Sequence, residues 1–170
     1  MIDKPSEPEE ILAIARASKG RRFLGLFSLG MLGVLVVGVA LFRTPALEWR
    51  VFLLVVGFAS FWMVEQMRRA TVGQIELTET VLRDSDGTVI AWIDDIEGMD
   101  RGVFAFKPSN GFLLKTKQSA EKAWRPGMWW RMGRRIGIGG MAPGHHTKLM
   151  SEIIAVILAR RDMEPDDRLD

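Results

Sequence analysis

The sequence predicts an α+β membrane protein in which a hairpin of two membrane-spanning helices precedes a small strand-rich domain. Two observations carry this prediction. The stretch 23–42 contains no charged residue over twenty positions, and as a helix it spans roughly 30 Å, the thickness of a bilayer hydrocarbon core. After Arg69 the pattern changes to short runs in which apolar and polar residues alternate, which is typical of strands.

A second uncharged run, 51–64, is shorter, but Leu47, Trp49 and Met67 extend it on both sides. Together the two runs predict a transmembrane helical hairpin over residues 23–70. Thr44 and Pro45 are suited to the N-cap and first position of its second helix. The alternative is a buried helical pair in a soluble protein. A cleaved signal peptide fits less well, because its apolar region is only about 7 to 15 residues long.

Residues 1–22 form a leader before the first apolar run. Ser6 followed by Glu9 resembles a helix capping box. The apolar residues that follow fall on one side of a helix: Ile11, Leu12, Ile14 and Ala15. This pattern predicts an amphipathic helix at the membrane surface, and the alternative is a frayed leader in water.

Lysine and arginine residues are concentrated before the first run and directly after the second. The loop between the runs holds only Arg43 and Arg50. The positive-inside rule therefore predicts that both termini are cytoplasmic and that the loop lies outside.

Residues 71–161 are predicted to form the cytoplasmic domain. Turn signals at Asp86-Gly87 and 107–110 separate short strand patterns. The predicted strands are 74–78, 81–83, 88–93, 102–106, 111–117 and Trp129–Ile138. A helix follows, with Thr147 as its cap and a stripe of apolar residues at helical spacing. The stripe consists of Leu149, Met150, Ile153, Ile154, Ile157 and Leu158. Residues 162–170 are acidic and predict a disordered tail.

This order of six or seven strands and one final helix resembles pleckstrin-homology-like (PH-like) domains. The segments 75–78, 86–90 and 94–96 resemble the opening of bacterial PH-like domains that follow two transmembrane helices. The segments 106–112 and 124–131 resemble alphaproteobacterial membrane proteins of this kind. The resemblance implies a β-barrel or bent sheet capped by the C-terminal helix, and it transfers no functional residue.

Charge in the domain is segregated along the chain. Residues 71–100 hold eight acidic groups and one basic group, whereas residues 101–148 hold ten basic groups and one acidic group. This asymmetry predicts a one-sided positive potential, and tryptophans interleave with arginines in the basic part. The candidate membrane or partner surface is Trp124, Arg125, Trp129, Trp130, Arg131, Arg134 and Arg135. The alternative is that the tryptophans are core residues and the arginines only solvate an outer face.

Nothing in the sequence predicts an enzyme or a cofactor. Cysteine is absent and His145 and His146 are the only histidines, so the spacing suggests no metal site. The glycine-rich stretch 133–140 lacks the Lys-Ser/Thr ending of a phosphate-binding loop and predicts a strand and bend with close backbone approach.

The sequence therefore predicts a non-catalytic inner-membrane protein whose PH-like domain binds the anionic membrane surface or a membrane-protein partner. Nucleic acid is not expected, because no recognised binding motif accompanies the basic residues. The alternative function is an accessory subunit or assembly factor of a larger membrane complex, which would interact through the hairpin.

Overall fold

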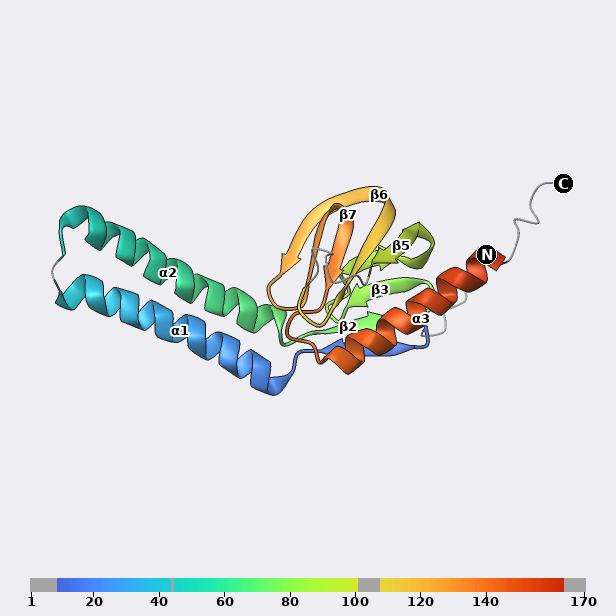
Figure 1. The fold of residues 1–170 in the computed structure, drawn as a ribbon, viewed down its shortest axis with the longest axis horizontal. Coiled ribbons are helices and arrows are strands. Elements are labelled where there is room, and N and C mark those ends of the chain that lie inside the picture. Colours follow the sequence, from blue (N-terminus) through green and yellow to red (C-terminus); the bar gives the residue numbers. More distant parts are fainter. Residues whose placement is uncertain (1–8, 44, 101–107, 164–170) are drawn as a thin grey trace, which may run out of the picture.

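Two long antiparallel helices project from one end of a β-rich domain, and a third helix lies along that domain (Figure 1). This computed structural model describes residues 9–43, 45–100 and 108–163. The helices are α1 (Lys19–Phe42), α2 (Leu47–Ala70) and α3 (Gly144–Met163). The strands are β1 (Ala13–Arg16), β2 (Gln74–Leu77), β3 (Val81–Asp84), β4 (Val89–Trp92), β5 (Ile96–Asp100), β6 (Phe112–Arg125) and β7 (Trp129–Ile138), with a short 3-10 helix, η1 (Ile93–Asp95), before β5.

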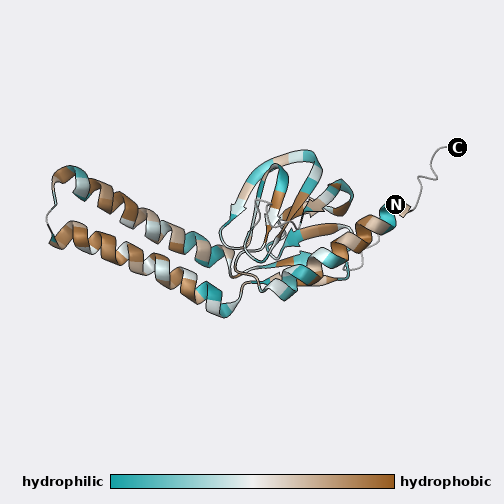
Figure 2. Cartoon of the chain, viewed as in Figure 1, coloured by the Kyte–Doolittle hydropathy of each residue, from teal (hydrophilic) through white to brown (hydrophobic). Residues whose placement is uncertain are grey.

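Small residues bring α1 and α2 into close contact. A Cβ added to Gly57 would lie 2.4 Å from Cγ2 of Val37, and a Cβ added to Gly33 would lie 2.9 Å from the Phe61 ring. Apolar residues cover the outer faces of the hairpin (Figure 2), and only 11% of the most apolar stretch of each helix is buried. Both helices are long and apolar enough to cross a membrane. A helical pair inside a soluble domain would instead be mostly covered.

The helix starts differ from those predicted. Helix α1 begins at Lys19, ahead of the uncharged stretch. Helix α2 has Ala46 at its N-cap and Leu47 as its first residue, so Pro45 is not the first helical position. The first backbone bond of α2 explains this start, because Arg50 N–H donates to the carbonyl of Ala46 at 3.0 Å. Thr44 lies outside the described residues.

The leader forms a strand, so the prediction of an amphipathic surface helix is wrong for residues 13–16. Strand β1 pairs antiparallel with β2, with Ala13 opposite Leu77. Ala13 and Ala15 are buried toward the core, where α3 contacts β1, and Arg16 is exposed. The alanines suit either secondary structure, and the sheet edge of β2 together with the covering helix decides in favour of a strand.

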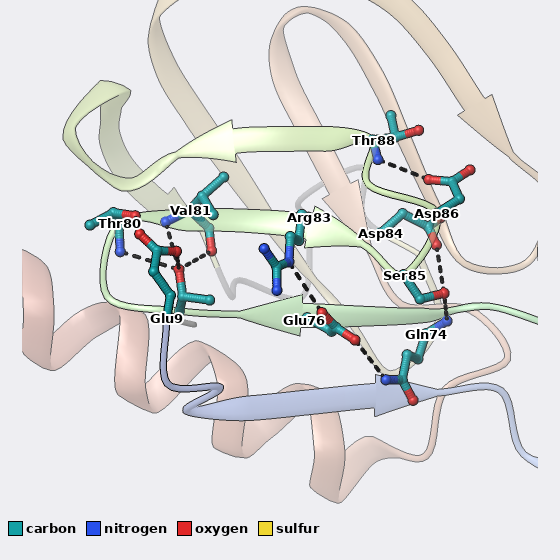
Figure 3. A network of polar contacts seen from close by, with 11 residues as sticks. Glu9, Gln74, Glu76, Thr80, Val81, Arg83, Asp84, Ser85, Asp86 and Thr88 are labelled. Carbon is teal, nitrogen blue, oxygen red and sulfur yellow. Dashed lines mark hydrogen bonds and ion pairs between the residues drawn. The ribbon is translucent and has the colours of Figure 1, made fainter. Parts of the chain in front are cut away.

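The residues before β1 are also attached to the domain. The Glu9 carboxylate accepts hydrogen bonds from the hydroxyl groups of Thr78, at 2.8 Å, and Thr80 (Figure 3). These two bonds hold the pKa of Glu9 below its usual value, the bond from Thr80 having the larger effect. Ser6, the other half of the proposed capping box, lies outside the described residues.

Within the described residues, seven strands form two hydrogen-bonded antiparallel sheets rather than one closed barrel. One sheet has the order β1-β2-β3-β4 and the other β5-β6-β7. The predicted turn at Asp86-Gly87 joins β3 to β4, and Gly87 has the positive φ of +87° that favours glycine there. The mixed α and β architecture of the prediction is thus confirmed, with β2 to β7 and then the final helix after the hairpin, whereas β1 precedes it.

Most predicted strands agree with the structure. The patterns at 74–78, 81–83 and 88–93 correspond to β2, β3 and β4, and Trp129–Ile138 is β7. The pattern at 111–117 is only the beginning of β6, which continues to Arg125 through irregular pairing with β7. The predicted strand at 102–106 lies outside the described residues.

Helix α3 packs its apolar stripe against the sheets. Met150, Ile154 and Leu158 are buried in the core, whereas Leu149, which was predicted to belong to the stripe, is 53% exposed. Thr147 is not the cap, because the helix begins at Gly144; its hydroxyl donates to the carbonyl of Asn110 and so ties the first turn to the chain before β6. The helix extends through 162–163, and the rest of the predicted tail lies outside the described residues.

Candidate membrane-facing surface

Strands β6 and β7 form a long hairpin that curls back on itself (Figure 1). The turn after β6 thereby meets the loop after β7. Gly139 N–H donates to the carbonyl of Met128 at 2.9 Å, and Met141 N–H donates to the carbonyl of Gly127 at 2.8 Å. These bonds give hydrogen-bond partners to backbone groups at the two ends of the β6–β7 hairpin that would otherwise lack them.

Glycines make the curl possible. A Cβ on Gly137 would lie 2.4 Å from the indole of Trp130, which folds over the same strand, and a Cβ on Gly140 would lie 2.8 Å from the carbonyl of Gly127. Gly133, at the bend, has a φ of +61°. The predicted use of the stretch 133–140 for a bend with close backbone approach is confirmed.

The curl places the end of β6 beside the base of the hairpin. Strand β6 contacts α2, and Arg125, its last residue, lines a hollow of about 350 Å³ together with Arg69 and Val72. Trp124 therefore lies close to the point where the chain leaves α2. In Figure 1 the arrowhead of β6 accordingly points to the end of α2.

Trp129 is a core residue, so its inclusion in the predicted surface is wrong. Its side chain is 2% exposed, and its indole N–H donates to the carboxylate of Asp84 at 3.1 Å. Asp84 is itself buried, at 6% exposure. The pair links β7 to β3 and gives both buried polar groups a partner, which is the usual condition for placing them in a core.

Two of the predicted arginines bridge strands. The guanidinium of Arg131 donates to the carbonyls of Val89 and Ile90 on β4, at 3.0 and 3.1 Å, and so connects the two sheets. Arg134 donates to the carbonyl of Thr116 at 2.8 Å and to the Glu97 carboxylate at 2.6 Å. These contacts give both side chains a structural role in the domain.

The acidic and basic segments also neutralise each other in part, which weakens the predicted one-sided potential. Arg125 pairs with Asp86 at 2.7 Å, and Lys115 pairs with Glu97 at 2.9 Å. Hydrogen bonding from Thr88, with a smaller effect of the Arg125 charge, lowers the pKa of Asp86. Segregation along the sequence thus becomes pairing across strands, because β3–β4 and β5 adjoin the basic hairpin.

Trp124 remains exposed, with 52% of its side chain in solvent. Half-buried Trp130 on β7 stands opposite Trp124 in the strand pairing. Two residues away along the two strands lie exposed Lys122 on β6 and Met132 on β7, which is 61% exposed. We refer to Lys122, Trp124, Trp130 and Met132 as the Trp124 surface. It encloses a hollow of about 410 Å³ whose lining is mainly apolar, with Ala123 and Arg131 completing the wall.

Sequence reasoning missed Lys122 and Met132. They lie two residues along β6 and β7 from the paired Trp124 and Trp130, so the two-residue alternation of a strand hairpin could have found them. Arg135 is exposed and stands opposite Lys115 on β6, away from these four residues along the strand. Lys117, Lys122 and Arg135 have no ion pair within the described part of the chain.

Comparison of the chain with protein-family models, curated proteins and solved structures gives no match. Its own geometry is therefore the basis for a functional interpretation. Within residues 9–43, 45–100 and 108–163, no three histidine or acidic side chains lie close enough to hold a metal ion. What the Trp124 surface offers is an exposed indole and thioether next to an unpaired ammonium group, a combination suited to the boundary between apolar chains and anionic headgroups.

Proposed function

We propose that this protein is a non-catalytic integral protein of a bacterial inner membrane, anchored by α1 and α2. Its cytoplasmic PH-like domain binds the anionic membrane surface through the Trp124 surface. The observation that carries the proposal is the position of exposed Trp124 at the end of β6, beside the base of an apolar helical hairpin.

The sidedness follows from strand pairing together with charge. Strand β1 precedes the hairpin and β2 follows it, yet the two pair in one sheet. If α1 and α2 cross a membrane, the chain segments before and after them therefore lie on the same side. The basic residues at the base of the hairpin favour the cytoplasmic side, because the connecting loop has only Arg43 and Arg50.

The PH-like interpretation is supported by the strand order. The described strands lie in two antiparallel sheets and are followed by one final helix, which is consistent with the six or seven strands and C-terminal helix that the resemblance implies. The present chain differs in one respect, because its first strand is separated from the second by the helical hairpin. Fold alone does not give function, so the binding proposal depends on the surface.

Several physical contributions favour lipid over water at the Trp124 surface. Indole rings prefer the headgroup region, and each lysine or arginine near an anionic leaflet contributes about 1 kcal/mol. Besides Lys122, exposed Lys19 and half-buried Arg22 stand at the start of α1, at the base of the hairpin. The surface therefore needs only a few such residues to hold the domain against the bilayer.

The test uses the full chain in nanodiscs whose lipids carry bromine near the headgroup, where bromine quenches nearby indoles. Subtracting the fluorescence of the Trp124→Phe variant from that of the parent isolates the Trp124 signal from the signals of Trp49 and Trp62 in α2. We expect stronger quenching of Trp124 in anionic than in zwitterionic lipid, and weaker quenching when salt screens the charges. Lys122→Gln should reduce the anionic preference, with Lys117→Gln as the matched control on the same strand.

Absence of Trp124 quenching in both lipids would overturn the proposal. A stoichiometric membrane protein that co-purifies in mild detergent and protects Trp124 from aqueous quenchers would also overturn it. That second result would favour the accessory-subunit function instead.

A further inference from the structure

The helical hairpin is inserted between two paired strands of one sheet. Only Ala17 and Ser18 separate β1 from α1, and only residues 71–73 separate α2 from β2. Strands β1 and β2 are hydrogen-bonded neighbours, with Arg16 opposite Gln74 at the end nearest the helices. No flexible linker is available to absorb a shift of one helix against the other.

The base of α1 also rests on the loop that follows β7. Ser18 N–H donates to the carbonyl of Met141 at 2.9 Å, and the Arg21 guanidinium donates to the carbonyl of Gly140 at 3.3 Å. A Cβ on Gly25 would lie 2.5 Å from the Met141 methyl and 3.4 Å from the sulfur of Met67. Met141 thus occupies the space at α1 that this glycine leaves, next to Met67 of α2.

Met141 contacts the turn before β7 as well. Its N–H donates to the carbonyl of Gly127 at 2.8 Å, and its sulfur lies 3.1 Å from the position of a Cβ on Gly127. That turn begins at Arg125, directly after Trp124. One methionine therefore contacts α1 and the turn that positions the Trp124 surface, and it shares the space beside Gly25 with Met67 of α2.

We propose that Met141 couples the packing of α1 against α2 to the conformation of the Trp124 surface. A membrane partner or lipid that shifts the hairpin would change binding at this surface, and binding there would change the hairpin by the same factor, as linkage requires. The link to binding rests on the proposed function, whereas the mechanical coupling does not. It needs only that the hairpin and turn share this side chain as a common contact.

The chain has no cysteine, so a disulfide can lock the hairpin cleanly. Cγ2 of Val37 lies 2.4 Å from the position of a Cβ on Gly57. Cβ of Val37 is one C–C bond further, so the two Cβ positions are at most about 4 Å apart, within the range of roughly 3.5–4.5 Å that a disulfide joins in Val37→Cys/Gly57→Cys. The probe is hydrogen exchange of the amides of Gly139 and Met141 in nanodiscs. The reduced form of the same protein is the folded reference, and Val37→Cys alone is the control for oxidation.

Oxidation should slow exchange at these two amides by about fivefold or more, the lower end of typical coupling between sites. Adding Met141→Ala should abolish this response while the disulfide still forms. Equal exchange in the oxidised and reduced proteins would overturn the coupling, and so would an undiminished response in the Met141→Ala variant. Hydrogen exchange is measured without anionic lipid. A failure of the proposed coupling can therefore be told apart from a failure of Trp124 to contact anionic lipid in the quenching experiment.

Discussion

The most direct test of the architecture is to place a charge in β1. Ala15 has no exposed surface and lies opposite Ile75 in the sheet, on the side of β1 that faces the core. In Ala15→Asp a carboxylate would be buried without a basic partner, which costs about 3–5 kcal/mol. For a chain of this size, each kcal/mol lowers Tm by about 2–4 °C, so the variant should melt about 10 °C below the parent.

Thermal unfolding of the full chain in nanodiscs, followed by circular dichroism, measures this difference. The matched control is Ile14→Lys, because residue 14 points to the other side of β1 and stands opposite Glu76. An opposite-charge pair across strands contributes only about 0.2–1 kcal/mol, so this control should melt near the parent. If Ala15→Asp does not accumulate, Ala15→Ser gives a graded loss of about 1–3 kcal/mol from its buried hydroxyl. Parent-like melting of both Ala15 variants would show that β1 does not belong to the core.

Two further predictions separate core from surface and follow pH. Trp129→Phe removes a hydrogen bond to the buried Asp84 carboxylate and should lower the free energy of unfolding by about 1.5–3 kcal/mol. Trp124→Phe should leave Tm unchanged. Equal losses in the two variants would contradict the assignment of Trp129 to the core and of Trp124 to the surface. The hydrogen bond from Lys115 is the main cause that keeps the pKa of the Glu97 carboxyl group below its ordinary value of 4.5. Ionised Glu97 therefore stabilises the folded state above pH 4.5, and this stabilisation is lost as the pH falls through the lower pKa of the folded state. Between about pH 6 and pH 3, Tm should consequently fall more in the parent than in Glu97→Gln.

Much of the fold could be predicted because its signals are local. Twenty uncharged residues specify a helix of membrane length without reference to the rest of the chain. The Asp86-Gly87 turn and the apolar spacing around Ile154 likewise depend only on neighbouring residues. The strand at 13–16 could not be predicted in this way. Its partner, β2, lies beyond the whole hairpin in sequence, and four residues with two buried alanines are compatible with either a helix or a strand.

The candidate surface was predictable only in composition. Seven tryptophan and arginine residues were expected to act together, but the curl of β6–β7 distributes them among three environments. Trp129 enters the core, Arg131 and Arg134 hold strands together, and Trp124 stays exposed. Alternation along β7 separates Trp129 from Trp130 but does not say which of the two faces is buried, and the pairing shifts between Lys115 and Ala123 further change which side chains face outward.

The same distribution determines how the surface can be tested. Replacing all the arginines between 125 and 135 would remove the contacts of Arg131 to β4 and of Arg134 to Glu97, so loss of lipid binding would be inseparable from loss of fold. A fragment that begins at residue 71 would lack β1, whose Ala15 is buried under the rest of the core. The helical hairpin therefore cannot be removed by cutting the chain at one point, since the domain begins before the hairpin and resumes after it. Because β1 and β2 flank the hairpin and pair in one sheet, only substitutions at exposed positions such as Trp124 and Lys122 can separate the proposed binding from stability.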